Sequence, residues 1–212
     1  MFRDREEAAR LLAVKLSKYR GSRPLVLGIP RGAVVMAAII ADRLGGDLDV
    51  ALVRKLGAPG QPELAVGAVD ETGRVNLDGT PDELGLDEAY VERERERQTA
   101  ALRARRARYT PARAPVDPSG RTVIVVDDGI ATGATLAAAL RLVRSRGPAR
   151  LVAAAAVAPP PAAARLMRDA DEVVVLATPE PFVAVGAFFD DFRQVSDDEV
   201  VELLERFGSE ER

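Results

Sequence analysis

Short apolar runs alternate along the chain with longer segments of helical periodicity. Val123–Val126 is an unbroken β-branched run, which is typical of a strand buried on both faces of a parallel sheet. The same reasoning predicts strands at residues 24–29, 48–53, 151–157 and 172–176, and helices at about 5–20, 34–44, 87–109, 136–144 and 159–168 and from 196 onward. This alternation predicts an α/β fold with a parallel central sheet and flanking helices.

Local signals refine this pattern at three places. Asp4 with Glu7, and Ser196 with Glu199, have the spacing of a capping box, which predicts the start of the first and last helices. Residues 57–62 form a turn-rich break after the strand at 48–53. Two short apolar runs flank Asp70–Gly73 and predict a β-hairpin with a four-residue turn.

Composition removes several kinds of chemistry. The 212 residues include no cysteine and no histidine, which excludes disulfides, thiol nucleophiles, Ser-His-Asp triads and His- or Cys-ligated metals. The net charge of −3 argues against nucleic acid as a partner. The apolar runs at 33–41 and 151–158 are far shorter than the roughly 20 residues that span a bilayer. We therefore expect a cytoplasmic protein without a membrane partner.

The most informative stretch runs from residue 122 to 140. Asp127 and Asp128 follow the buried strand, residues 129–135 form a loop of small residues, and a helix comes next. Backbone N–H groups and a helix N-terminus bind anions, and Thr132 and Thr135 add hydroxyl groups. Adjacent carboxylates can accept hydrogen bonds from a vicinal diol or hold Mg²⁺ through water. Together these features predict a site for a ribose 5-phosphate, whereas the plain alternative is a turn with acids near a helix start.

The segment V-I-V-V-D-D-G-I-A-T-G-A-T resembles the phosphoribosyl pyrophosphate (PRPP) motif of the type I phosphoribosyltransferases. The resemblance covers the core, about residues 24–57 and 121–178. It implies that Asp127 and Asp128 contact the ribose hydroxyls and hold Mg²⁺ indirectly, through substrate or water. The loop residues that it implies for the 5-phosphate are Ala131, Thr132, Gly133, Ala134 and Thr135.

The resemblance extends to two other loops. The segment G-I-P-R-G-A resembles the family's pyrophosphate loop, so Gly28, Arg31 and Gly32 would face pyrophosphate; otherwise Arg31 is a solvated turn residue. Arg54 and Lys55, which follow the strand at 48–53, resemble a basic pair that reaches the same group; otherwise they are a solvated strand end. As in the family, Arg31 and Lys55 would stabilise the departing pyrophosphate.

The resemblance also implies an organisation and an activity. We expect one domain over residues 1–212, with a mobile loop and hood insertion at 57–115, a C-terminal hood segment at 178–212, and a homodimer. The implied reaction transfers a ribose 5-phosphate group from PRPP to a nitrogen base, with Mg²⁺ as cofactor and release of pyrophosphate. Residues 178–195 of the hood segment contain four of the six phenylalanines, which form either local core or a shelf for a flat base.

One position departs from the family pattern. Hypoxanthine-guanine members carry an aspartate base where this chain has Ala131, so the acceptor base stays open. Glu71, in the predicted hairpin, is our candidate for the missing general base. Arg103–Arg108 is a cationic helix end that is either a solvated face or a contact for RNA or phosphate. The alternatives to an enzyme are a regulator of the same fold that binds nucleotide or RNA without turnover, or a phosphosugar enzyme of another type.

Overall fold

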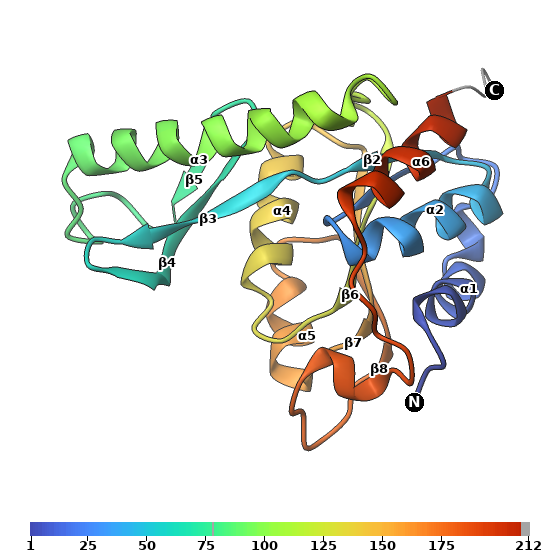
Figure 1. Cartoon of the computed structure of the whole chain (residues 1–212). Helices are drawn as coiled ribbons and strands as arrows, with labels where there is room; N and C mark the ends of the chain where they lie inside the picture. Colours follow the sequence, from blue (N-terminus) through green and yellow to red (C-terminus); the bar gives the residue numbers. More distant parts are fainter. Residues whose placement is uncertain (78, 209–212) are drawn as a thin grey trace.

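A five-stranded, all-parallel sheet forms the centre of the molecule in the computed structural model, which describes residues 1–77 and 79–208 (Figure 1). Its strand order is β2-β1-β6-β7-β8. The strands are β1 (Leu25–Gly28), β2 (Asp47–Val50), β6 (Thr122–Gly129), β7 (Arg150–Val157) and β8 (Glu172–Ala177). The predicted α/β fold with a parallel central sheet is therefore confirmed.

Helices cover both faces of this sheet (Figure 1). One face packs against α1 (Arg5–Lys15), α2 (Gly32–Leu44) and α6 (Asp197–Gly208), and the other against α4 (Ala134–Arg144) and α5 (Pro160–Leu166). Alternate residues of β6 serve the two layers: Val123 and Val125 pack toward α4, and Ile124 and Val126 toward α2. Both sides of the strand are buried, which explains why its sequence is apolar without interruption.

A second unit, formed by the part of the chain that connects β2 to β6, projects from the core (Figure 1). It consists of an antiparallel sheet of β3 (Val53–Ala58), β4 (Gln61–Asp70) and β5 (Val75–Leu77), with α3 (Glu88–Tyr109) packed along it. We call this unit the arm. The predicted hairpin is confirmed, because β4 and β5 pair on either side of a turn in which the Gly73 N–H donates to the Asp70 carbonyl oxygen at 3.1 Å.

The structure corrects one predicted strand. The apolar run at 48–53 belongs to two strands, because β2 ends at Val50 and β3 starts a different sheet at Val53. The predicted break at 57–62 is the β3–β4 turn, where Ala58 pairs with Gln61 and Gly60 has a φ of 70°. A mainly apolar run thus hides a change of sheet, since the same residue types suit both.

The helix ends follow their caps. The Glu7 N–H donates to the Asp4 carboxylate at 2.7 Å, and Ser196 and Glu199 exchange bonds of 2.8 and 3.1 Å. The first helix is shorter than predicted, since a 3₁₀ turn, η1 (Ser17–Tyr19), follows it. The last helix, α6, buries Val200, Leu204 and Phe207 in the main core.

In the predicted hood segment 178–212, Val185 and Phe188 of η2 (Val185–Phe188) pack against the same core as α6, and residues 209–212 lie outside the described residues. No helix in the described part of the chain is long and apolar enough to cross a membrane.

The strand order reverses direction between β1 and β6. The chain leaves β1 toward β2 on one side, and β6 toward β7 on the other. Ligands in such sheets bind beyond the carboxyl ends of the strands at this reversal. The loops that follow β1 and β6 carry the predicted ribose, phosphate and glycine-loop residues, and both are at this place.

Candidate active site

The acid pair forms the end of β6. Asp127 still pairs with Ala155 of β7, so the strand holds its carboxylate at the sheet edge. The Asp128 N–H donates to the Asp127 carboxylate at 2.9 Å. Burial, and secondly the neighbouring charge of Asp128, raise the pKa of Asp127 to about 7. The pair therefore combines one carboxylate that is costly to ionise with a second that has a cationic partner.

That partner is Arg5, at the first position of α1. Its Nε and Nη2 both lie 2.9 Å from Asp128 Oδ2, and its Nη1 donates to the Arg193 carbonyl oxygen at 2.7 Å. Its guanidinium carbon lies 3.8 Å from the centre of the Phe192 ring. Sequence reasoning missed Arg5, which is separated from Asp128 by 123 positions. One local hint existed, because a cation in the first turn of a helix opposes the helix dipole.

The loop after β6 has the form of an anion cradle. Gly133 is the N-cap of α4 with a φ of 82°, a left-handed conformation that favours glycine. The side chains of Ala131, Thr132, Ala134 and Thr135 are exposed around it. Since the first N–H groups of α4 have no partner within the helix, this turn presents donors and a partial positive charge to a ligand.

The loop after β1 touches the acid pair directly. A methyl group on Gly32 would overlap Asp128 Oδ2 and would lie 2.8 Å from Arg5 Nε. A methyl group on Gly28 would lie 2.7 Å from the Val34 Cα atom, so both glycines are needed for close packing. The peptide bond between Pro30 and Arg31 is cis. The structure thus brings the two predicted loops together at one point.

Arg31 leaves this loop toward the last helix. Its Nη1 lies 3.8 Å from the carboxylate of Asp197, in the first turn of α6, and its side chain is 39% exposed. The contact is long and partly solvated, so it holds Arg31 only weakly. Arg31 therefore borders the site without a strong competing partner in the described part of the chain.

The basic pair lies elsewhere than predicted. Arg54 and Lys55 are inside β3 of the arm, not at the end of a core strand. They nevertheless line one groove together with Thr135 of the phosphate loop and Tyr90 of α3. Arg54 also donates to the Gln98 side chain of α3 at 3.2 Å. The groove between arm and core is thus where cations and phosphate loop meet.

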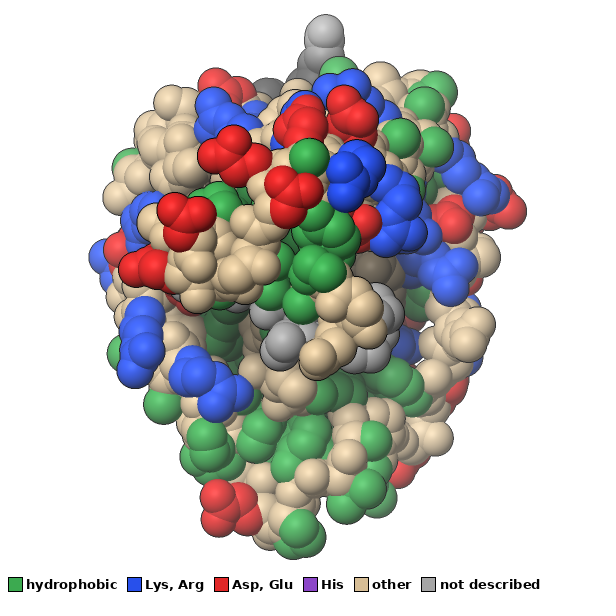
Figure 2. Space-filling view, turned by 90° about the vertical axis from the view of Figure 1, so that its left-hand side faces the viewer, with side chains coloured by type: hydrophobic (Ala, Val, Ile, Leu, Met, Phe, Trp, Pro, Cys, Tyr) green, Lys and Arg blue, Asp and Glu red, His purple; other side chains and the backbone are tan. Residues whose placement is uncertain are grey.

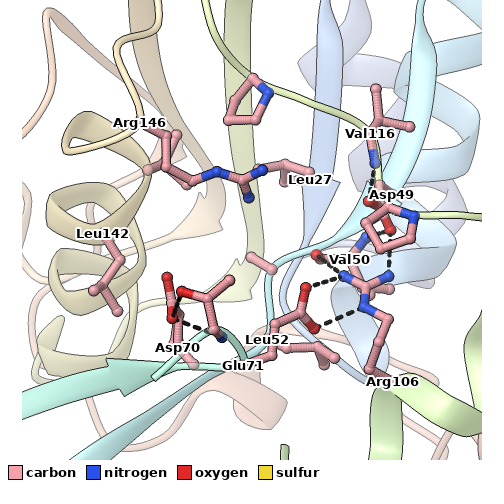
Figure 3. A pocket seen from close by; sticks show the side chains of 16 residues that line it. Leu27, Asp49, Val50, Leu52, Asp70, Glu71, Arg106, Val116, Leu142 and Arg146 are labelled. Carbon is pink, nitrogen blue, oxygen red and sulfur yellow. Dashed lines mark hydrogen bonds and ion pairs between the residues drawn. The ribbon is translucent and has the colours of Figure 1, made fainter. Parts of the chain in front are cut away.

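Glu71 is not beside the acid pair. Its carboxylate accepts bonds of 2.7 and 2.9 Å from Arg106 of α3, which also donates to Asp49 at 2.9 Å (Figure 3). This cluster borders a cavity next to Leu142, near the C-terminal end of α4, whereas the phosphate loop lies at the opposite end of that helix. Eleven helical residues extend about 16 Å. Glu71 is therefore a structural partner of Arg106, and we no longer assign it the role of general base.

The arginines at the end of α3 also have partners within the molecule. Arg106 is held as described, and Arg103 donates to the Glu71 carbonyl oxygen at 3.2 Å. Arg105 and Arg108 lie 3.9 and 3.6 Å from the Asp197 carboxylate. These contacts weaken the interpretation of this cluster as an RNA site. Figure 2 views the molecule from the left-hand side of Figure 1, where acidic and basic side chains are interspersed over the upper part and hydrophobic side chains predominate below.

The phenylalanines divide into two groups. Phe189 is buried between Phe2 and Phe192, with ring centres 5.6 and 5.0 Å apart, so this group is local core. Phe182 and Phe188 form a second, partly exposed pair at 5.2 Å, for which a base shelf stays a prediction. The segment also reaches the acid pair, because a methyl group on Gly129 would overlap Val185 of η2.

Comparison with known proteins agrees with this geometry. Residues 4–190 match the model of the phosphoribosyl transferase domain. The chain belongs to this family. Two Mycobacterium tuberculosis proteins named "putative phosphoribosyl transferase" are 44% identical to it over 207 residues, which cover 97% of this chain and 47% of theirs. The chain thus spans about half the length of these curated relatives.

A solved structure shares the architecture of the whole chain. The crystal structure of TT1426 from Thermus thermophilus is 48% identical, with a TM-score of 0.90 and coverage of 98% of this chain and 99% of that one. A purine phosphoribosyltransferase from Pyrococcus horikoshii is more distant, with 17% identity, a TM-score of 0.47 and coverage of 85% and 93%. The arm as well as the core is therefore part of the fold that this chain has in common with the Thermus protein.

Proposed function

We propose that this protein is a phosphoribosyltransferase that transfers the ribose 5-phosphate group of PRPP to a nitrogen base. The observation that carries the proposal is the meeting of the acid pair, the phosphate loop of α4 and the glycine loop of α2 at the reversal of strand order. This arrangement offers hydroxyl acceptors, a phosphate cradle and a second anion-accepting turn within one edge of the sheet.

In the proposed reaction, a nitrogen atom of the base forms a bond to the C1 carbon of the ribose while the bond from C1 to the pyrophosphate oxygen breaks. Asp127 and Asp128 hold the ribose hydroxyls, and the loop of Ala131, Thr132, Gly133, Ala134 and Thr135 holds the 5-phosphate. Gly28, Gly32, Arg31, Arg54 and Lys55 surround the leaving pyrophosphate. Fixing the sugar and stabilising the negative charge on the leaving group lower the barrier.

Mg²⁺ fits this site as an ion shared with the substrate. In the described part of the chain, no group of three or more acidic, histidine or cysteine side chains is placed to hold a metal by itself. Asp127 and Asp128 supply two adjacent carboxylates, so further oxygen ligands would come from substrate and water. When bound, the ion would supply charge neutralisation for pyrophosphate.

The test is turnover with a panel of nitrogen bases. The protein, PRPP and Mg²⁺ are mixed with each base, and released pyrophosphate is measured. At least one base should release pyrophosphate, and Asp128→Asn should abolish that release. If no base supports turnover and PRPP gives no shift in a thermal titration, the proposal is wrong. Binding of PRPP without turnover would favour the regulator of the same fold, and Ala131, which supplies no base, is the observation on its side.

A further inference from the structure

Arg5 stands out because its local position is unfavourable and its distant contacts are strong. It occupies the first residue of α1, where a positive charge is unfavourable because it opposes the helix dipole. Its side chain is nevertheless only 11% exposed and that of Asp128 only 18%. The stability of α1 therefore does not explain why the Arg5 side chain lies buried in the site.

Three groups fix the orientation of the Arg5 guanidinium. The Phe192 ring lies 3.8 Å from its central carbon, the Arg193 carbonyl oxygen accepts a bond of 2.7 Å, and Asp128 Oδ2 accepts a bond from Nε and lies 2.9 Å from Nη2. Gly32 closes the remaining side, since a methyl group there would overlap the Arg5–Asp128 pair. The ion pair is therefore locked between both terminal segments and the glycine loop.

The contacts on Asp128 are uneven in a way that suits a binding role. Both Arg5 nitrogens contact Oδ2, and within residues 1–77 and 79–208 no group donates a hydrogen bond to Oδ1. A carboxylate oxygen has two lone pairs, so Oδ1 keeps its full capacity to accept hydroxyl protons. An acceptor that is already oriented loses less freedom when the ligand binds.

We infer that Arg5 is a positioning residue for the sugar: it holds Asp128 by Oδ2 so that Oδ1 accepts a ribose hydroxyl. This inference rests on the proposed function, because it assigns Asp128 to the ribose. It adds a residue from the N-terminal helix to a site that otherwise comes from the segments after β1 and β6 and from strand β3 of the arm. It also gives Phe192 and the Arg193 carbonyl oxygen a purpose, which is to orient Arg5.

The test separates sugar recognition from phosphate recognition. Affinities for ribose 5-phosphate and for inorganic phosphate are measured by calorimetry for the parent, Arg5→Met, Arg5→Lys and Arg10→Met. Arg10 is the matched control, because it lies on the same helix and its bond of 2.6 Å to Glu6 is exposed. Hydrogen bonds to charged groups contribute enough that Arg5→Met should weaken ribose 5-phosphate binding about 10–100-fold.

Phosphate affinity should stay unchanged in every variant, since the loop of α4 binds it without Asp128. Arg5→Lys, which keeps the charge but loses the fork, should retain part of the lost affinity. Provided that the parent binds both ligands, two results would overturn the inference. One is an equal loss of affinity for ribose 5-phosphate and for phosphate in both Arg5 variants, and the other is an unchanged affinity for ribose 5-phosphate in Arg5→Met. A parent that binds neither ligand would overturn the proposed function, and this inference with it.

Discussion

The core edge and the arm both carry clusters of charged residues, but the pairing of these charges differs. At the core edge, Asp127 has no cationic partner in the described part of the chain, and Asp128 keeps one oxygen without a donor. In the arm, Arg106 is fully engaged by Glu71 and Asp49. The difference teaches that incomplete pairing at a sheet edge indicates binding, whereas complete pairing away from it indicates support for the fold.

The largest effect should come from removing the arm's central cation. Arg106→Met would leave the carboxylates of Asp49, which is 2% exposed, and Glu71 without their partner. Breaking such a buried pair costs about 3–5 kcal/mol in the free energy of unfolding. Urea denaturation measures this change, with Arg103→Met as the control. Phosphate affinity of the folded variant should equal that of the parent; a lower affinity would show that the cluster serves the ligand site.

The second prediction asks whether the arm also acts in catalysis. Lys55 lines the groove shared with Thr135, so it should stabilise pyrophosphate as it leaves. Once an acceptor base is known, Lys55→Met and Arg31→Met should each lower kcat about 10²-fold, with a smaller change in KM for PRPP. Ribose 5-phosphate, which carries no pyrophosphate, should bind both variants like the parent. Unchanged kcat in both variants would restore the view that these side chains are solvated.

The same comparison explains what could be predicted from sequence. The acid pair, the loop and the helix of residues 122–140 are contiguous in sequence, so the sequence alone predicts that they lie together at the end of the strand. Arg5 and Glu71 could not be placed in this way, because their partners lie 123 and 35 positions away. The apolar run at 48–53 misled for a related reason, since pairing with Asp70, and not residue type, assigns Val53 to the arm.

The third prediction concerns the cost of keeping Asp127 in the site. The pKa of this carboxyl is about 7 in the folded protein, against 3.8 as its ordinary value. Between these values the unfolded chain releases the proton and the folded chain retains it, so stability falls as pH rises through this window and levels off above it. Asp127→Asn should therefore raise the melting temperature at about pH 8 and leave it nearly unchanged at about pH 4.

The matched measurement is the affinity of the Asp127→Asn variant for ribose 5-phosphate. This affinity should be lower than that of the parent although the variant is more stable. A functional acid that destabilises its own protein has this signature. A variant that is less stable than the parent at high pH would contradict the assignment, and Asp127 would then be a structural turn residue.

The smallest effect should come from the exposed arginines beside Arg106. Arg105 and Arg108 lie next to Asp197 at 3.9 and 3.6 Å, with side chains 36% and 50% exposed. Solvated pairs of this kind contribute about 0–1 kcal/mol, so Arg105→Met should change the free energy of unfolding by no more than about 0.5 kcal/mol. The contrast with Arg106, one position along the helix, compares a buried, hydrogen-bonded ion pair with a long, solvated one.

The double variant Arg105→Met, Arg108→Met also tests the remaining alternative for this surface. Because both cations already face Asp197, a single-stranded RNA should bind the parent no better than the double variant at any salt concentration. A nucleic-acid surface would instead show affinity that falls steeply with salt, with a slope that decreases when the two charges are removed. That outcome would make the arm a ligand surface in its own right. If the RNA affinity is the same in both proteins, ligand binding stays assigned to the core edge and the arm keeps its structural role.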